Sequence, residues 1–200
     1  ADPHAITGLA VRCSQLSALT GLADAVVSAG GVGVPTPFGS TASSANRHTI
    51  LDAIDQAMYF IDGHSPDWGV CNDSLLRAFN SALRREGTLF AQTRDQFGRW
   101  VNEYRSVPIY DAGLLYDQST RVITNSENPN GGAANQTSVY FIKNGVASHV
   151  HGIEKEPLSV RDLGELQTAP RLRTRIEWLI GLADWHTRAL SRVQQIQATT

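Results

Sequence analysis

The chain has 200 residues and a mass of 21.7 kDa, which suits one compact domain with a buried core. A hydrophobic fraction of 42% and a charged fraction of 18% exclude an intrinsically disordered chain, and no apolar run reaches the roughly 18 to 20 residues of a membrane-spanning helix. The net charge of −2 excludes the overall basic field that draws proteins onto nucleic acid.

The first residues and the cysteine content favour a cytosolic protein. Residues 1–8 lack the basic, apolar and small-residue order of a signal peptide. Cys13 and Cys71 are too few for a disulfide framework, so we expect two buried thiols. Lysine occurs only at Lys143 and Lys155, so arginine supplies almost all of the positive charge. This bias favours ion pairs at protein interfaces, and a GC-rich genome produces the same bias.

The first half of the chain reads mainly as helix. Residues 8–22 predict a short helix or an irregular turn, and the Gly/Pro/Ser-rich residues 28–46 predict a mobile loop. Thr49 and Asp52 have the spacing of a capping box, which predicts a helix that begins after Thr49 and is stopped by Gly63. Residues 67–71 then predict a short buried strand, and Asn72 caps a second helix that ends at Gly87.

The second half reads mainly as sheet. Short alternating runs occupy residues 98–113, residues 137–142 and 148–153 predict two strands, and residues 125–135 predict a loop. Helices come early and strands late, without the regular alternation of a parallel sheet with crossover helices. This order predicts an α+β architecture.

Residues 172–196, LRTRIEWLIGLADWHTRALSRVQQI, alternate as one long strand near the end of the chain. One face of this strand carries Thr174, Ile176, Trp178, Ile180 and Leu182, and we expect it to be buried. The other face mixes charged with apolar residues, so we expect it to be partly covered by another element.

Few residues suggest chemistry. His149 and His151 are two residues apart, and Glu154 could complete a three-ligand zinc set. The alternative interpretation of the histidines is a solvated face of an edge strand. Asp52 and Asp55 suit the N-terminal dipole and the solvated side of their helix better than a paired acid and base. The four tryptophans, at positions 68, 100, 178 and 185, predict core packing, with interface anchoring as the alternative.

Four motifs in order resemble the tailed-phage major capsid proteins of the HK97-like fold. They are ITGLAVR at residues 6–12, the segment from ILDAID to LLRAF at 50–79, FGRWVNEYRSVPIYDAG at 97–113, and the segment from LSVRDLGE to RVQQI at 158–196. The residues that carry the resemblance are Gly8, Leu9, Asp52, Asp55, Asn72, Pro108, Asp111, Asp162, Gly164, Glu165, Arg173, Arg175, Glu177, Trp178 and Gly181.

The resemblance implies a structural protein without catalysis, cofactor or metal. Copies of it would form the hexamers and pentamers of an icosahedral shell around double-stranded DNA, in the virion and, during assembly, in the host cytoplasm. Scaffold and portal proteins are further implied partners. Residues 1–19 would follow the spine helix of the family, residues 20–150 would form the axial domain, and residues 151–200 would supply the C-terminal strands of the peripheral domain.

The sequence also departs from the family. The N-terminal arm, the extended loop and the spine helix that precede the GL motif in the family do not precede Ile6 here. We therefore expect these 200 residues to form a monomer or a weak oligomer, with Trp178 or Trp185 exposed where the spine helix would lie. Two alternatives are an encapsulin-like nanocompartment shell and a small metal-dependent hydrolase that uses His149, His151 and Glu154.

Overall fold

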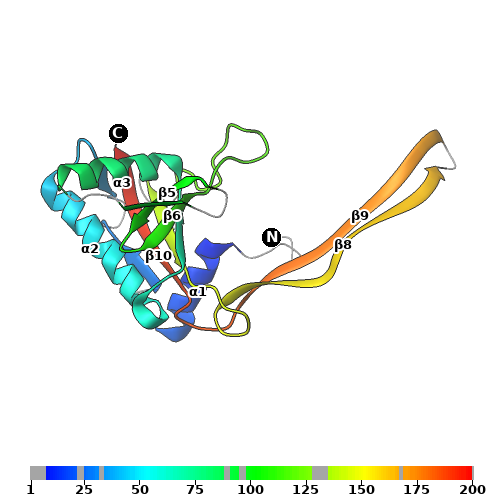
Figure 1. The fold of residues 1–200 in the computed structure, drawn as a ribbon, viewed down its shortest axis with the longest axis horizontal. Helices are drawn as coiled ribbons and strands as arrows, with labels where there is room; N and C mark the ends of the chain where they lie inside the picture. The colour runs from blue at the N-terminus through cyan, green and yellow to red at the C-terminus, as the bar shows by residue number, and fades with distance from the viewer. Residues whose placement is uncertain are drawn as a thin grey trace.

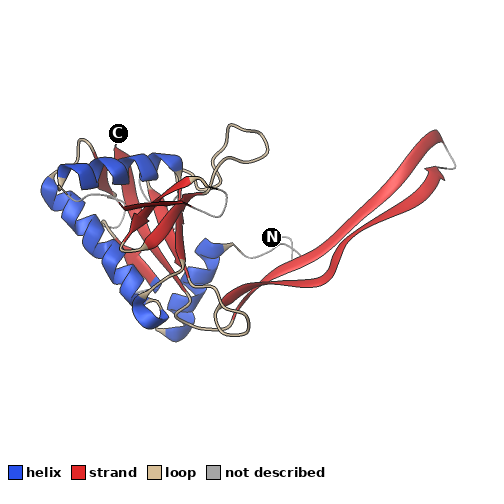
Figure 2. Cartoon of the chain, viewed as in Figure 1, coloured by secondary structure: helices blue, strands red, loops and turns tan. Residues whose placement is uncertain are grey.

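A computed structural model of the chain describes residues 8–21, 25–31, 34–87, 91–94, 98–127, 135–166 and 169–199. The chain forms a body, in which helices pack on a sheet, and a long two-stranded arm that projects away from it (Figure 1). Figure 2 shows that most of the arm stands clear of the helices. Among the described residues, no helix is long and apolar enough to cross a membrane.

The elements of the body surround one mixed sheet. Its helices are α1 (Leu9–Thr20), α2 (Ser44–Phe60), the short 3-10 helix η2 (Asp62–His64) and α3 (Asp73–Arg85). Its strands are β1 (Val26–Ser28), β2 (Thr36–Gly39), β3 (Trp68–Cys71), β4 (Ala91–Arg94), β5 (Trp100–Tyr104), β6 (Val107–Asp111), β7 (Thr137–Ile142) and β10 (Leu190–Thr199). The arm consists of β8 (Val150–Leu166) and β9 (Ala169–Asp184).

The sheet of the body is eight-stranded, in the order β1-β10-β7-β3-β6-β5-β4, with β2 also paired to β10. Strand β10 runs parallel to β1 and β2 and antiparallel to β7, and β3 joins β7 antiparallel and β6 parallel. The mixed sheet and the three α-helices confirm the predicted α+β class.

Alternate residues of β7 divide the core into two layers. Val139 and Phe141 are buried against α2 and α3, whereas Tyr140 and Ile142 are buried on the side of α1. Because successive strand residues point to opposite faces, this central strand is covered on both sides. Its six residues are all buried, as a near-continuous apolar run predicts.

Helix α2 begins earlier than the capping-box prediction placed it. Ser43 is the N-cap, and its side chain accepts a hydrogen bond of 3.2 Å from the backbone N–H of Asn46. Thr49 lies inside the helix, where its hydroxyl donates to the carbonyl of Ala45. The first turn of α2 is polar, so the apolar period that marked the helix in the sequence starts only at Ile50. The prediction of Thr49 as N-cap was therefore wrong.

The segment before α2 contains a helix and two short strands. Residues 9–20 form the helix α1, which ends at Gly21 with a left-handed φ of 65°. The predicted mobile loop at residues 28–46 was wrong in part, because Thr36–Gly39 is the strand β2 and pairs with the last residues of β10. The Gly and Pro content of this segment hid a strand that is held by a partner more than 150 residues away. Residues 128–134 of the predicted Asn/Gly-rich loop lie outside the described residues.

The C-terminal stretch is two strands instead of one. Strand β9 ends at Asp184 in the arm, and β10 begins at Leu190 inside the sheet of the body. The predicted domain boundary near residue 150 coincides with the start of β8, but residues 190–199 pair with β1, β2 and β7. The last strand thus belongs by its hydrogen bonds to the body, and not with residues 151–184. The assignment of these parts to an axial and a peripheral domain stays a prediction.

The cysteine prediction is confirmed and the tryptophan prediction is largely wrong. Cys13 and Cys71 are free, buried thiols, 1% and 2% exposed. Trp68 is partly buried against the core cluster on the α1 side of the sheet, but Trp100, Trp178 and Trp185 are all more than half exposed. From the departures of the sequence from the capsid family we expected Trp178 or Trp185 to be exposed, and both are exposed.

Candidate functional site

The arm carries many of the exposed large apolar side chains of the described residues. Strands β8 and β9 pair antiparallel from Val150↔Asp184 near the body to Leu166↔Ala169 at the tip. The register shifts at several positions of β8, whereas β9 alternates regularly. A two-stranded ribbon in water is at best marginally stable by itself, because it has no third strand or helix to bury its faces.

One face of the arm is mostly apolar, although Glu154 and Asp162 also lie on it. The regular alternation of β9 puts Leu172, Ile176, Trp178 and Ile180 on the same side, and Val160 lies directly opposite Ile176. We call these five residues the apolar face. The alternation in the sequence predicted this grouping correctly, but the predicted burial was wrong, since Ile176 is 67% and Trp178 56% exposed. In the described part of the chain, no element covers this face of the ribbon beyond its base.

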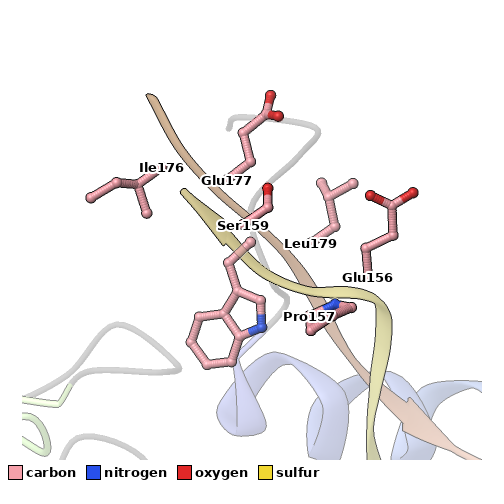
Figure 3. A pocket seen from close by; sticks show the side chains of 7 residues that line it. Glu156, Pro157, Ser159, Ile176, Glu177 and Leu179 are labelled. Carbon is pink, nitrogen blue, oxygen red and sulfur yellow. The ribbon is translucent and has the colours of Figure 1, made fainter. Parts of the chain in front are cut away.

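The opposite side of the arm carries a group of charged side chains, together with the exposed Leu179 and Ile153. Arg173, Arg175 and Glu177 follow one another on β9, Arg161 lies directly opposite Arg175, and Glu156 lies opposite Leu179. We call Arg161, Arg173, Arg175, Glu177 and Glu156 the charged face. Glu177 and Glu156 extend to the same side of the ribbon in Figure 3, next to Leu179. The arginines lie toward the tip and the glutamates toward the body.

A bulge in β8 hollows the arm between its two ends. The register shifts between Glu156 and Ser159, so that Pro157 and the residue after it have no partner on β9. The hollow is shallow, has a volume of about 340 Å³ and is lined by Pro157, Ser159, Ile176 and Trp178 among others (Figure 3). The Trp178 indole N–H donates to Glu154, at 2.7 Å, which fixes the ring beside the bulge.

Histidines gather where the arm joins the body. His149, just before β8, has its Nε2 atom 3.2 Å from a carboxylate oxygen of Asp62, and its ring centroid is 5.3 Å from that of His186. This contact with His149 holds the pKa of the Asp62 carboxyl below its usual value, with a further contribution from Lys143. The ring of His151 stacks on Trp185 at 6.2 Å. Side chains from the segment before β8 and from the segment after β9 therefore hold the base of the arm.

The structure does not assemble the predicted zinc set. His149 is paired with Asp62, His151 with Trp185, and Glu154 with Trp178. Within the described residues, no group of three histidine, cysteine, aspartate or glutamate side chains is arranged to hold a metal ion. The alternative of a solvated face also fails for His149, whose side chain is only 16% exposed.

The motif residues of the body serve local structure. Asn72 caps α3, Gly8 precedes α1, and Asp55 receives a hydrogen bond from Tyr104 and an ion pair from Arg105. Asp52 is exposed on α2 and does not occupy the predicted capping position. Three further motif residues complete this set: Leu9 begins α1, Pro108 lies within β6, and Asp111 ends β6 and accepts from the N–H of Gly113.

The motif residues of the arm cluster on the ribbon itself. Asp162 accepts a hydrogen bond from the N–H of Gly164, which has a φ of 73°, and Glu165 follows in β8. Arg175 pairs with Glu177 on one face, and Trp178 lies on the other. Gly181 lies opposite Ile153, where a Cβ atom would come within 3.2 Å of the isoleucine side chain. The fifteen residues thus mark two separate regions, and they do not converge on one site.

Sequence reasoning missed the buried arginine of β10. Arg192 is 2% exposed, donates to the Ser138 hydroxyl and to Glu127, and lies over the ring of Tyr140. Burial without these partners would cost several kcal/mol, by the order of magnitude for an unpaired charge. The available signal was an arginine between Leu190 and Val193 in a strand-like run. Glu127 also borders an apolar hollow of about 490 Å³ between α1 and β3. Its carboxylate is already paired with Arg192 and accepts a hydrogen bond from the Tyr140 hydroxyl.

Comparisons with known proteins establish the fold. No family model matches the chain, and no curated protein matches its sequence. The chain is similar to the holo-SrpI encapsulin complex of Synechococcus elongatus determined by cryoEM, with a TM-score of 0.57 and 20% sequence identity over 88% of this chain. It spans about half of that protein, since 54% of the encapsulin chain is covered. The chain therefore has an HK97-like α+β fold, as the ordered motifs predicted.

Proposed function

We propose that this chain is the subunit of a self-assembling shell, and that it assembles through its arm. The observation that carries the proposal is the exposed apolar face of the arm on an HK97-like body. Leaving large apolar side chains in water costs roughly 1.5 to 3 kcal/mol for each side chain that could be buried. Contiguous exposed apolar patches mark interaction sites in soluble proteins.

The lead candidate within this class is the major capsid protein of a tailed phage or prophage. Its support is the order of the four motifs in the sequence. The shell would enclose double-stranded DNA, with scaffold and portal proteins as partners, in the virion and first in the host cytoplasm. The net charge of −2 suits a wall that holds DNA without strong binding.

The second candidate is an encapsulin-like nanocompartment shell. The observation that favours it is the structural similarity to an encapsulin chain. Both candidates use the same assembly chemistry, so they differ in what the shell encloses.

The experiment is sedimentation velocity of the purified chain over a concentration series, with negative-stain imaging of the heaviest fractions. Of the monomer and the weak oligomer that the sequence left open, the proposal requires the weak oligomer. Reversible association that a Trp178→Ala variant weakens therefore supports the proposal, and a chain that stays monomeric at every concentration overturns it. The content of particles made in the native host separates the candidates. Long nuclease-protected DNA supports the capsid, and protein cargo without DNA supports the nanocompartment.

A further inference from the structure

The charged face of the arm contains like charges in direct opposition. Arg161 and Arg175 are cross-strand partners, and Arg173 lies two residues further along the same side of β9. Like charges directly opposite each other destabilise an antiparallel pair. Arg175 has an ion pair with Glu177, but among the described residues neither Arg161 nor Arg173 has a carboxylate partner. Carboxylates supplied by another molecule would therefore stabilise this face.

The same face carries suitable carboxylates, displaced toward the body. Glu177 is two residues from Arg175, or about 7 Å along a strand, and Glu156 lies further toward the base of the arm. Two such faces that meet antiparallel would place the arginines of each arm over the glutamates of the other. Two faces that meet parallel would place arginines over arginines, which charge repulsion disfavours.

We propose that the charged face of the arm is a contact between two copies of this chain, which meet antiparallel about a twofold axis near Arg175 and Glu177. This inference rests on the proposed function and names the partner surface of the arm. A twofold contact uses the same patch on both subunits, so a self-complementary pattern of charges is its requirement. The apolar face is on the other side of the ribbon and stays available for a different contact.

A phosphate backbone fits the charged face less well than a second arm does. Glu156 and Glu177 lie in the row of the arginines and would repel phosphates. The contact is also small, because an arm face is two strands wide and covers only a few hundred Å², below the roughly 800 Å² per partner of a stable complex. We therefore expect weak and salt-sensitive pairing.

The test is a charge-reversal exchange between two variants. Arg161→Glu with Arg175→Glu, and Glu156→Arg with Glu177→Arg, each place like charges over one another in the antiparallel pair. We expect each variant alone to associate at least about tenfold more weakly than the wild type, and an equimolar mixture to recover most of the association. Sedimentation velocity at low and at moderate salt measures both effects.

The control reverses the charge of two arginines that lie on the body, away from the arm. Arg84→Glu with Arg85→Glu alters two exposed arginines at the end of α3 and should leave association unchanged. If Trp178→Ala weakens association while neither charge variant does, the proposed function stands and the antiparallel contact is refuted. If the wild type does not associate at all, both fail. Loss of DNA binding in the Arg161→Glu, Arg175→Glu variant, with association unchanged, would also overturn the contact in favour of nucleic acid.

Discussion

Asn72 links three parts of the body, and its replacement tests how they are held together. Its side-chain oxygen accepts a hydrogen bond of 2.8 Å from the N–H of Leu75 and so caps α3. Its amide nitrogen lies within hydrogen-bonding distance of the Ile123 carbonyl, the Asn125 side chain and the Thr137 hydroxyl. The side chain is 1% exposed, so water cannot replace these partners.

The expected cost of Asn72→Ala follows from these bonds. Loss of an N-cap costs about 1 kcal/mol. The amide has two hydrogens, so it can donate two full hydrogen bonds, and each contributes about 1 kcal/mol in a folded protein. We therefore expect Asn72→Ala to lower the free energy of unfolding by about 3 kcal/mol. With a urea dependence of roughly 2 kcal/mol/M, the midpoint of unfolding falls by about 1.5 M.

Ser43→Ala is the matched control, because Ser43 caps α2 but has no other hydrogen bond from its side chain among the described residues. It should cost only about 1 kcal/mol. Asn72→Asp keeps the cap but loses both donors and places a carboxylate beside three oxygen atoms, so its cost should be at least that of Asn72→Ala. Urea unfolding followed by circular dichroism measures all three. Equal costs for Asn72→Ala and Ser43→Ala would refute the reasoning, because the donors would then contribute nothing.

Three further predictions concern the arm, its base and the thiols. Trp178→Ala should change the free energy of unfolding of the body by less than about 0.5 kcal/mol, since the ring packs on the arm alone, and a larger loss in urea unfolding would place the ring in the core. His149→Gln should raise the pKa of the Asp62 carboxyl toward its ordinary value, as followed by NMR, whereas His48→Gln should not. Because the pKa of Asp62 is lowered in the folded state, the stability that His149 contributes should be present above the ordinary pKa of aspartate and disappear as the pH falls through the lowered value. A destabilisation by His149→Gln that grows as the pH falls would contradict this sign. Burial raises the pKa of the Cys13 thiol to about 12 and raises that of Cys71 as well, so neither thiol should react with a disulfide reagent at about pH 8 until urea unfolds the chain, and a fast reaction in the native protein would show that one of them is accessible.

Local signals in the sequence were sufficient to predict the elements that have a clear N-cap or a clear hydrophobic period. Asn72 as the cap of α3 and the alternation of β9 were both predicted correctly, because each depends on residues within a few positions of one another. The order of the four motifs was sufficient to predict the HK97-like fold. The polar first turn of α2 had no such signal, so its start was placed too late.

The tertiary structure alone decided where each strand lies. Alternation in the sequence gives a strand two distinct faces, but it does not say whether another element covers either face. The apolar face of β9 is exposed because the ribbon projects away from the body. Strand β2 forms because β10, far along the chain, offers it an edge. The pairing of His149 with Asp62, and of Arg192 with Glu127, likewise depends on segments that only the fold brings together. Sequence periodicity determined the faces of these elements, and long-range hydrogen bonding and packing determined what each face meets.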